Sequence, residues 1–360
     1  MASIMKSSVV AIFILLWAAA AGTSRATSRT LNNFDEEATI VKKHEEWMGL
    51  YGRVYKNEEE KAKRRKIFKE NAEFVERFNS EGNKSFTVSL NHFADLTTKE
   101  FVASYTGDRY NYNSQPPSSK PNSNKKGLQL GYQNVSLAEI DSNLDWRQKG
   151  AVNDIKHQGR CGCCWAFASV AAVESIIQIK TGNLLSLSEQ QLVDCAVPNR
   201  NGCGGYNTDK AFEYVKENGG LVSETDYPYE GVDGMICNNE EITNPVGKIS
   251  GYNDVPQYSE EEILKVVVNQ PVAVSIDAHA QAFHLYNRGI FTSDQCGNDL
   301  NHAVTIIGYG EEGDGVGKHW LVRNSWGKNW GEQGYMRLEK DVANPTGACG
   351  ITIHASYPIY

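Results

Sequence analysis

The sequence predicts an α+β protein built from two parts of different character. Residues 35–80 carry many helix-forming and charged residues, with apolar residues at roughly helical spacing, and this favours a helical N-terminal part. Residues 166–180 are helical by composition and period, whereas the apolar segment Leu300–Ile307 is typical of a strand. All eight cysteines lie between Cys161 and Cys349. The two parts of the chain therefore differ in their need for cysteine, in disulfides or as thiols.

The composition is that of an ordinary globular protein. Of the 360 residues, 40% are hydrophobic and 22% are charged, which argues against disorder, collagen or a coiled coil. The formal net charge is −8 and no basic run is long enough to bind a polyanion, so nucleic acid is not expected as a partner. Residues 1–139 hold 20 Lys+Arg and 16 Asp+Glu (net +4), and residues 140–360 hold 16 and 28 (net −12). Either the two parts attract each other or both are ordinary solvated surfaces.

The first segment has the pattern of a secretory signal peptide. Lys6 is followed by 18 residues without charge, and their strongly apolar centre, Val9–Ala21, is shorter than a membrane span. Small residues such as Gly22 surround the expected cleavage point. Residues 1–24 are therefore predicted to be a signal peptide, with a signal anchor as the alternative. No later stretch is apolar enough to span a membrane, and the remaining chain is expected to have passed through an oxidising compartment.

Residues 25–139 form the second predicted segment, with a helical part over about 40–102 and a linker over about 106–135. The linker is rich in Ser, Asn, Pro and Gly, which is typical of an exposed loop that a protease cleaves. Asn83 and Asn134 begin N-glycosylation sequons. Six residues of the helical part follow one another at intervals of 3 or 4 and share one helical face: Glu60, Arg64, Phe68, Asn71, Val75 and Asn79. Taken alone, such a stripe more often marks a packed helix face than a functional motif.

Cys164 is the candidate nucleophile. A helix that begins at this residue places its sulfur at the positive end of the helix dipole, which favours the thiolate over the thiol. Because an ordinary cysteine, with a pKa of about 8.5, is mostly protonated at neutral pH, it also needs a base. His302 lies 138 residues later and is the candidate base, and Asn324, 22 residues further on, has the right chemistry to orient the imidazole.

Other interpretations of these residues stay open at this point. Cys161 and Cys164 have the spacing of a redox CxxC motif, and together with Cys163 they form a cluster of the kind that binds metals. His302 also fits a hydrogen-bonded histidine of the core. The redox and metal interpretations, however, need neither the neighbouring glutamine and tryptophan nor the distant histidine and asparagine.

Several segments of the chain resemble those of papain-like cysteine proteases. Three of them are similar to the catalytic segments of that family, in the same order: QGRCGCCWAF at 158–167, LNHAV at 300–304 and RNSWG at 323–327. The helical stripe resembles the ERFNIN motif of the family's inhibitory prosegments, with Val75 in the isoleucine position. Asn91-x-Phe93-x-Asp95 is similar to their second motif, although Ser89 stands where glycine is usual. The later segments look most like plant members, including senescence-associated ones.

The resemblance implies a role for each residue of the candidate site. Cys164 would be the nucleophile, His302 the general base and later acid, and Asn324 the residue that orients the imidazole. Trp326 would shield the Asn–His hydrogen bond from water, and Gln158 would donate its side-chain amide to the oxyanion, together with the backbone N–H of Cys164. The implied chemistry is acyl transfer through a thioester that water then hydrolyses. No cofactor and no metal are implied.

The family's fold implies a papain-like arrangement of two lobes, preceded by a helical prodomain. The first lobe is helical, the second is β-barrel-like, and the active-site cleft lies between them. The mature domain is expected to start near Ile140 and to comprise residues 140–360. Three disulfides are implied: Cys161–Cys203, Cys195–Cys237 and Cys296–Cys349. Cys163 is left over, and we interpret it as a small residue on the cleft wall, with a regulatory or redox role as the alternative.

The resemblance also implies a set of substrate-binding residues. They are Gly204, Gly205 and Tyr206 in a glycine loop, Ser275, Ala303 and His354 in the main specificity pocket, and Trp326. The glycine loop departs from the family pattern, as if one residue were lost before the glycines. His354 is unusual for a pocket that commonly accepts large apolar side chains. We hypothesise that neutral His354 tolerates apolar or aromatic groups and that protonated His354 favours acidic groups near pH 5, a passive wall being the alternative.

These features predict a secretory-pathway cysteine endopeptidase that is made as a zymogen. A prosegment of net +4 should bind a domain of net −12 more weakly as pH falls and carboxylates are protonated, so maturation is expected at acid pH. The expected partners are protein and peptide substrates, the prosegment itself and cystatin-like inhibitors. The enzyme is expected to be a monomer in a vacuole, a lysosome-like compartment or the extracellular space. A non-catalytic homologue and a thiol–disulfide oxidoreductase are the alternative functions.

Overall fold

The computed structural model describes residues 37–107, 132, 135–313 and 317–360. Its internal contacts divide the chain into two units, residues 1–71 and residues 72–360. The predicted signal peptide, most of the predicted linker and the sequon at Asn134 lie outside the described residues. Asn83, the other sequon residue, is exposed in the loop that follows Ser80. In the part of the chain that the structure describes, no helix is long and apolar enough to cross a membrane.

The first unit contains two helices that pack on each other. One covers residues 37–51, and the other, α2, runs from Glu58 to Ser80 and continues past the boundary of the unit. The side chain of Asn57 accepts a hydrogen bond from the backbone N–H three residues later (2.9 Å), which satisfies one of the free donors at the start of α2. Phe68, which belongs to the predicted stripe, is buried against the ring of Trp47, with 5.4 Å between the ring centroids.

From residue 72 onward the N-terminal segment is part of the second unit. Strand β1 (Phe86–Val88) follows α2, and the Asn79 side chain donates to the carbonyl of Val88 (2.9 Å) and accepts from its N–H (3.1 Å). Helix α3 (Thr98–Tyr105) begins with a capping box. The helical part predicted over 40–102 therefore contains a strand, because residues 86–88 pair with a strand more than 190 positions away, and its last helix extends to Tyr105.

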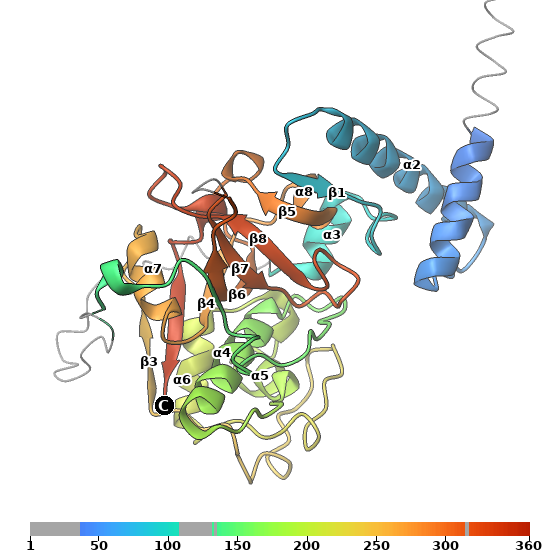
Figure 1. Cartoon of the computed structure of the whole chain (residues 1–360). Helices are drawn as coiled ribbons and strands as arrows, with labels where there is room; N and C mark the ends of the chain where they lie inside the picture. Colours follow the sequence, from blue (N-terminus) through green and yellow to red (C-terminus); the bar gives the residue numbers. More distant parts are fainter. Residues whose placement is uncertain (1–36, 108–131, 133–134, 314–316) are drawn as a thin grey trace, which may run out of the picture. The chain divides into compact units, whose positions relative to one another are not determined.

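Three helices form a first, helical lobe of the remaining chain (Figure 1). They are α4 (Cys164–Thr181), α5 (Glu189–Cys195) and α6 (Thr208–Glu217). Helix α4 is buried from its first residue to Ile177, as its apolar and small residues require, and it ends at Gly182, whose φ of 78° suits the left-handed C-cap. Trp165, Leu192 and Phe212, one from each helix, lie in the same buried core.

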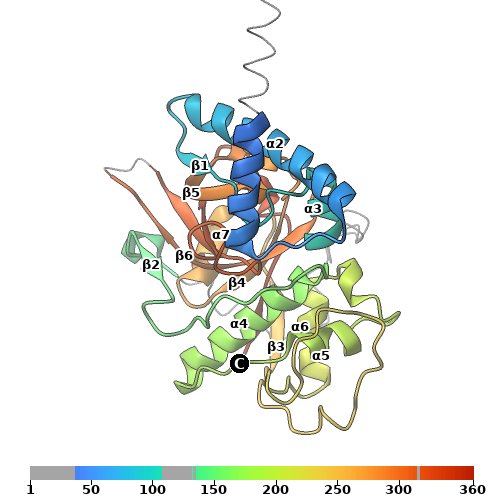
Figure 2. The same cartoon turned by 90° about the vertical axis from the view of Figure 1, so that its right-hand side faces the viewer.

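The second lobe is built on a mixed β-sheet (Figures 1 and 2). Its strands are β2 (Leu144–Asp145), β3 (Gly251–Asp254), β4 (Val272–Ile276), β5 (Tyr286–Phe291), β6 (His302–Gly310), β7 (His319–Arg323), β8 (Tyr335–Glu339) and β9 (Ala355–Ile359). The order is β1-β5-β8-β7-β6-β4-β9-β3, with β2 paired to β6. Only the β5–β8 pair among these is parallel. Helices α7 (Glu260–Val267) and α8 (Gln281–His284) belong to the same lobe. Short 3₁₀ turns elsewhere in the described residues lie at Leu137–Glu139, Gly202–Gly204, Ser293–Gln295 and Ala348–Gly350.

Helix α4 connects the two lobes, because it packs against β6 and β4. The Thr305 hydroxyl of β6 donates to the carbonyl of Ala168 in α4 (3.2 Å), and the hydroxyls of Thr208 and Ser356 lie 2.8 Å apart. The predicted α+β fold with a helical lobe and a β lobe is confirmed. The packing places the N-terminus of α4 beside the start of β6, where the candidate catalytic residues are.

Candidate active site

Cys164 is the first residue of α4 and is fully buried. Its sulfur accepts a hydrogen bond from the backbone N–H of Ala303 (3.3 Å), the residue that follows His302 on β6. This contact brings together two predicted site residues that are far apart in the sequence. The start of α4 supplies the helix N-terminus that the sequence predicted for the nucleophile.

His302 and Asn324 lie side by side because β6 and β7 are adjacent antiparallel strands. The Nε2 of His302 lies 2.9 Å from Oδ1 of Asn324. Since Oδ1 can only accept, Nε2 carries the ring proton and Nδ1 is left with a free lone pair. Within the described residues Nδ1 has no hydrogen-bond partner. Trp326 is stacked on the imidazole, with ring centroids 4.3 Å apart and planes 19° apart, and it covers the His–Asn hydrogen bond.

Gln158 is buried and held from several sides. Its Oε1 accepts a hydrogen bond from the Ser325 hydroxyl (2.6 Å), and its Nε2 donates to the carbonyls of Cys161 (2.8 Å) and Tyr105 (3.2 Å). The indole N–H of Trp326 donates to the same carbonyl of Tyr105 (3.1 Å). A peptide carbonyl of the N-terminal segment thus occupies the position at which the amide of Gln158 is aimed.

The N-terminal segment continues past Tyr105 along the site. Thr106 and Gly107, which fall in the predicted exposed linker, are buried instead. The reason is local: the N–H of Gly107 donates to the carbonyl of Asn301 (2.7 Å), next to His302. A side chain at Gly162 would not fit here, since its Cβ would lie 2.5 Å from the carbonyl oxygen of Thr106.

Burial under this segment keeps the Cys–His pair uncharged. Burial raises the pKa of the Cys164 thiol to about 11, although the backbone N–H of Ala303 partly opposes this. Burial also lowers the pKa of His302 to about 4, and the hydrogen bond with Asn324 opposes it only in part. Near neutral pH the covered site therefore holds a thiol and a neutral imidazole rather than an ion pair.

The predicted pocket residues lie close to the nucleophile. Ser275 on β4 and Ala303 on β6 are directly paired across the sheet. Nδ1 of His354 lies 3.5 Å from the Ser275 hydroxyl. Its Nε2 lies 3.7 Å from a carboxylate oxygen of Asp209, near the start of α6. Sequence reasoning missed this acidic neighbour, because 144 residues separate Asp209 from His354 and no local motif joins them.

The altered glycine loop is anchored to the helical lobe. Gly202–Gly204 form a 3₁₀ turn, in which the N–H of Gly204 donates to the carbonyl of Asn201 (3.0 Å), and Gly205 follows with a φ of 97°. The Tyr206 ring packs edge-on against Trp165, with centroids 5.3 Å apart. Tyr206 therefore contributes to the lobe's core as well as to the loop.

The cysteines separate into bonded and free ones. The structure pairs Cys161 with Cys203, Cys195 with Cys237 and Cys296 with Cys349, and it leaves Cys163 and Cys164 free. Cys161 is thus not available to form a CxxC disulfide with Cys164. No group of three or more His, Cys, Asp or Glu residues is placed to hold a metal ion in the described ranges.

Comparison with known families agrees with this geometry. The model described as "Papain family cysteine protease" matches residues 140–359, which hold the Cys–His–Asn site. The chain belongs to the papain family of cysteine proteases. A second model, "Cathepsin propeptide inhibitor domain (I29)", matches residues 44–101, the segment that precedes the buried Tyr105. The protease is therefore made as a proform with an inhibitory propeptide.

Several similar proteins come from plants. The protease is 44% identical to the senescence-specific cysteine protease SAG39 of Oryza sativa subsp. indica, over 90% of this chain and 91% of that one. It is 46% identical to the senescence-specific cysteine protease SAG12 of Arabidopsis thaliana, with the same two shares covered. The solved structure of a recombinant stem bromelain precursor matches with a TM-score of 0.79 at 42% identity, covering 89% of this chain and 99% of that one. The resemblance stated from the motifs is confirmed.

Proposed function

We propose that this protease is an endopeptidase in which Cys164 is the nucleophile, His302 the base and Gln158 an oxyanion donor. The proposal rests on the way these residues meet with Asn324 at one place. The sulfur of Cys164 contacts the residue after His302, and Nδ1 of His302 is the basic nitrogen that Asn324 leaves free. Nε2 of Gln158 already donates to a peptide carbonyl. The same carbonyl also receives the indole N–H of Trp326.

The proposed reaction has two steps. His302 Nδ1 takes the thiol proton, the sulfur of Cys164 attacks the peptide carbonyl carbon, and Gln158 Nε2 and the N–H of Cys164 stabilise the negative oxygen. The C–N bond then breaks as the imidazolium passes its proton to the leaving amine. In the second step Nδ1 takes a proton from water, the hydroxide adds to the thioester carbon, and the C–S bond breaks as the sulfur regains its proton.

The propeptide inhibits by occupying this site with its own backbone. The carbonyl of Tyr105 takes the donors of Gln158 and Trp326, and the N–H of Gly107 takes the carbonyl of Asn301. Asn91 adds a contact outside the site, because its amide donates to the carbonyl of His284 (2.8 Å). A substrate has to displace these hydrogen bonds before it can reach Cys164.

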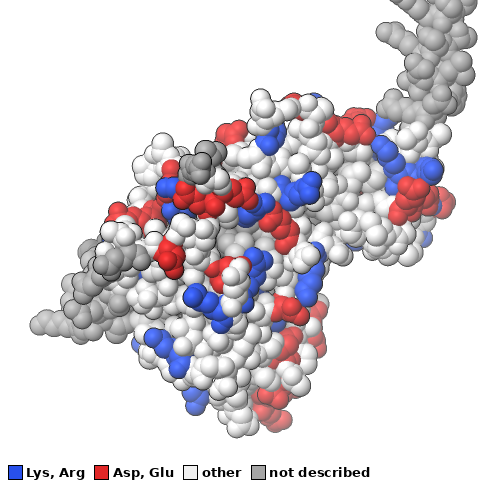
Figure 3. Space-filling view, in the orientation of Figure 1, with Lys and Arg blue, Asp and Glu red and all other residues white. Residues whose placement is uncertain are grey.

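Maturation is expected to be faster at pH 4.5 than at pH 7. The covered form holds His302 with a lowered pKa, so that form is favoured above the ordinary histidine pKa of about 6.5 and loses stability as pH falls from there toward about 4. The Arg160 side chain adds a further link to the propeptide through its contact with Tyr105. On the face drawn in Figure 3, acidic and basic side chains are interspersed.

Intact-mass analysis of the proprotein over time measures this difference. The expected product begins near Ile140 and cleaves a peptide blocked at both ends, as an endopeptidase does. Equal processing rates at the two pH values would contradict acid release. A mature product that cleaves only peptides with a free end would contradict the endopeptidase assignment.

We also propose the organisation that the sequence predicted outside the site. Residues 1–24 are a signal peptide, residues 25–139 the propeptide and residues 140–360 the mature domain. The destination is a vacuole, a lysosome-like compartment or the extracellular space, with glycans at Asn83 and Asn134. The mature enzyme acts as a monomer on protein and peptide substrates, and cystatin-like inhibitors bind it.

Asp209 modifies the hypothesis that protonated His354 selects acidic side chains. Burial opposes ionisation of this carboxyl, but contacts with His354 and the backbone of Lys210 outweigh it and hold the pKa of Asp209 below its ordinary value. The carboxylate therefore balances the positive charge of a protonated His354. The pair is expected to give the pocket a preference for apolar side chains at both acid and neutral pH.

Replacing Asp209 with asparagine is expected to make the pocket favour acidic substrate side chains at acid pH. The measurement compares peptides that differ only in the residue bound by this pocket. In D209N the kcat/KM for an acidic side chain, divided by that for an apolar one, should rise about tenfold at pH 4.5 and much less at pH 7. The reason is that, without the Asp209 carboxylate, a protonated imidazole attracts an acidic side chain and a neutral one does not. His354→Met in the D209N background is the matched control and should show no such pH dependence, because neither ionisable group of the pair is then present. Identical ratios for D209N and the parent at pH 4.5 would show that the pair does not determine specificity.

A further inference from the structure

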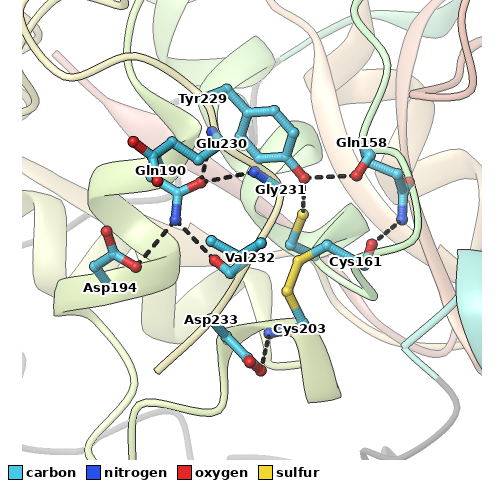
Figure 4. The surroundings of a disulfide bond; sticks show 12 residues. Gln158, Cys161, Gln190, Asp194, Cys203, Tyr229, Glu230, Gly231, Val232 and Asp233 are labelled. Carbon is cyan, nitrogen blue, oxygen red and sulfur yellow. Dashed lines mark hydrogen bonds between the residues drawn. A yellow bond between two sulfur atoms is a disulfide. The ribbon is translucent and has the colours of Figure 1, made fainter. Parts of the chain in front are cut away.

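Tyr229 connects a loop of the helical lobe to the candidate oxyanion donor. Its hydroxyl lies 2.6 Å from the backbone oxygen of Gln158 (Figure 4). It also lies 3.0 Å from the sulfur of Cys163. The Gln158 carbonyl can only accept, so the tyrosine proton is donated to it. The phenol oxygen is then the acceptor for the thiol proton of Cys163. The order of donors is therefore Cys163 to Tyr229 to Gln158.

The loop that carries Tyr229 is held firmly. The Gln190 side chain on α5 accepts from the N–H groups of Glu230 and Gly231 (3.0 and 3.1 Å) and donates to the carbonyl of Val232 (2.9 Å), as Figure 4 shows. The Tyr229 ring also packs edge-on against Phe167 of α4, with centroids 4.9 Å apart. The hydroxyl of Tyr229 is thus presented from a fixed support rather than from a free loop.

The other polar groups of Gln158 already have partners. Its N–H donates to the carbonyl of Ser325 (2.9 Å), and its Oε1 accepts from the hydroxyl of the same residue. Its Nε2 is the group that faces Tyr105 in the proform. The backbone oxygen is the remaining group, and Tyr229 holds it. Without Tyr229, and within the described residues, the peptide unit after Gln158 keeps only the hydrogen bond from its N–H, that of Gly159, to Nδ1 of His157 (2.9 Å). Its carbonyl end can then shift, and the side-chain amide of Gln158 shifts with it.

We propose that Tyr229 is a positioning residue for the oxyanion donor Gln158, with Cys163 as its hydrogen-bond donor. The inference rests on the proposed role of Gln158. It also gives Cys163 a role that differs from a redox or regulatory thiol. Cys163 is fully buried, and burial raises the pKa of its thiol, so it stays protonated and donates. Burial also raises the pKa of the Tyr229 hydroxyl, which likewise stays a donor.

A double-mutant cycle between Tyr229 and Gln158 tests the proposal. Each full-length variant is matured with an aspartic protease that is then blocked, and active sites are counted by titration with an irreversible inhibitor. Gln158→Ala should lower kcat by about 100- to 1,000-fold. Tyr229→Phe should lower kcat by about tenfold with KM changed by less than about twofold, because misplacement of a donor weakens only the transition state. In the Q158A background, adding Y229F should lower kcat by less than about twofold.

Two further comparisons separate positioning from general stability. Tyr227→Phe removes a hydroxyl from the same segment that donates to Asp194 (2.9 Å) instead, so kcat per active site should stay within about twofold of the parent. Cys163→Ser, which restores a donor to Tyr229, should have a higher kcat than Cys163→Ala. An equal cost of Y229F in both backgrounds would overturn the proposal for Tyr229 alone. A Q158A variant with normal kcat would overturn the proposed role of Gln158 and, with it, this inference.

Discussion

Replacing Cys164 with alanine is expected to abolish self-processing and to lower peptide hydrolysis by about 10⁴-fold or more. The sulfur forms the covalent bond in the proposed mechanism, and removal of the nucleophile from a catalytic group of this kind leaves only the contribution of binding and the oxyanion donors. The measurement is the initial rate on a peptide blocked at both ends, after maturation by an unrelated protease. The variant should still fold, with a small loss of thermal stability, since only the sulfur is removed and the N–H of Ala303 loses its acceptor.

Ser169→Ala provides the matched control for this variant. Ser169 lies on the same helix, one turn further on, and its buried hydroxyl donates to the carbonyl of Trp165 (2.8 Å) without contacting the Cys–His–Asn site. S169A should process itself and retain hydrolysis within about twofold. If C164A kept more than about one hundredth of the parent rate, Cys164 would not be the nucleophile. The neighbouring thiol of Cys163 would then be the next candidate.

Replacing Lys156 with methionine is expected to cost about 3–5 kcal/mol of the free energy of unfolding at pH 7. Its ammonium lies 2.7 Å from Glu189, 3.7 Å from Glu174 and 3.7 Å from Glu224, and the first two carboxylates are buried. Removal of the cation leaves the buried carboxyl of Glu189 without its close cation, whereas Glu174 keeps Arg323 at 3.9 Å. Urea unfolding of the proform of the C164A variant, which cannot digest itself, measures the loss.

The loss should be smaller at pH 4.5 than at pH 7. Burial raises the pKa of the Glu189 carboxyl, and Lys156 opposes this. A group whose pKa is raised in the folded state adds stability as pH falls toward its ordinary pKa, because the folded protein then binds more protons than the unfolded one. In K156M the bound proton neutralises the Glu189 carboxylate that has lost its cation. Lys210→Met is the control, since its pair with Glu213 is exposed and should be worth less than about 1 kcal/mol. Equal losses for K156M and K210M would contradict the role given to the buried cluster.

The catalytic residues could be predicted because each lies in a local motif. Cys164 is marked by the residues around it and by the apolar helix that follows, and His302 precedes a strand-like run. The helical stripe of the propeptide was also visible, since residues at intervals of 3 or 4 share a helical face. These signals depend on residues that are neighbours in the sequence, and such neighbours can be read from a single sequence.

The remaining features depend on contacts between distant residues. The Tyr229 hydroxyl meets a carbonyl 71 positions away, and the Tyr105 carbonyl meets an amide 53 positions away. Strand β1 is only three residues long and becomes a strand because β5 pairs with it. Neither a backbone carbonyl nor a three-residue strand has a sequence signature. Tyr105, Asp209 and Tyr229 were therefore found only once the tertiary packing was known.

The most direct test of the account is to locate the reactive group in the unmodified protein. The proprotein is incubated at pH 4.5 with an irreversible thiol-directed epoxide inhibitor, and its mass and modified peptide are determined. The account predicts loss of the propeptide near Ile140 before inhibition is complete and one adduct, on Cys164. An adduct on Cys163, or a folded protein that neither processes itself nor reacts, would contradict it.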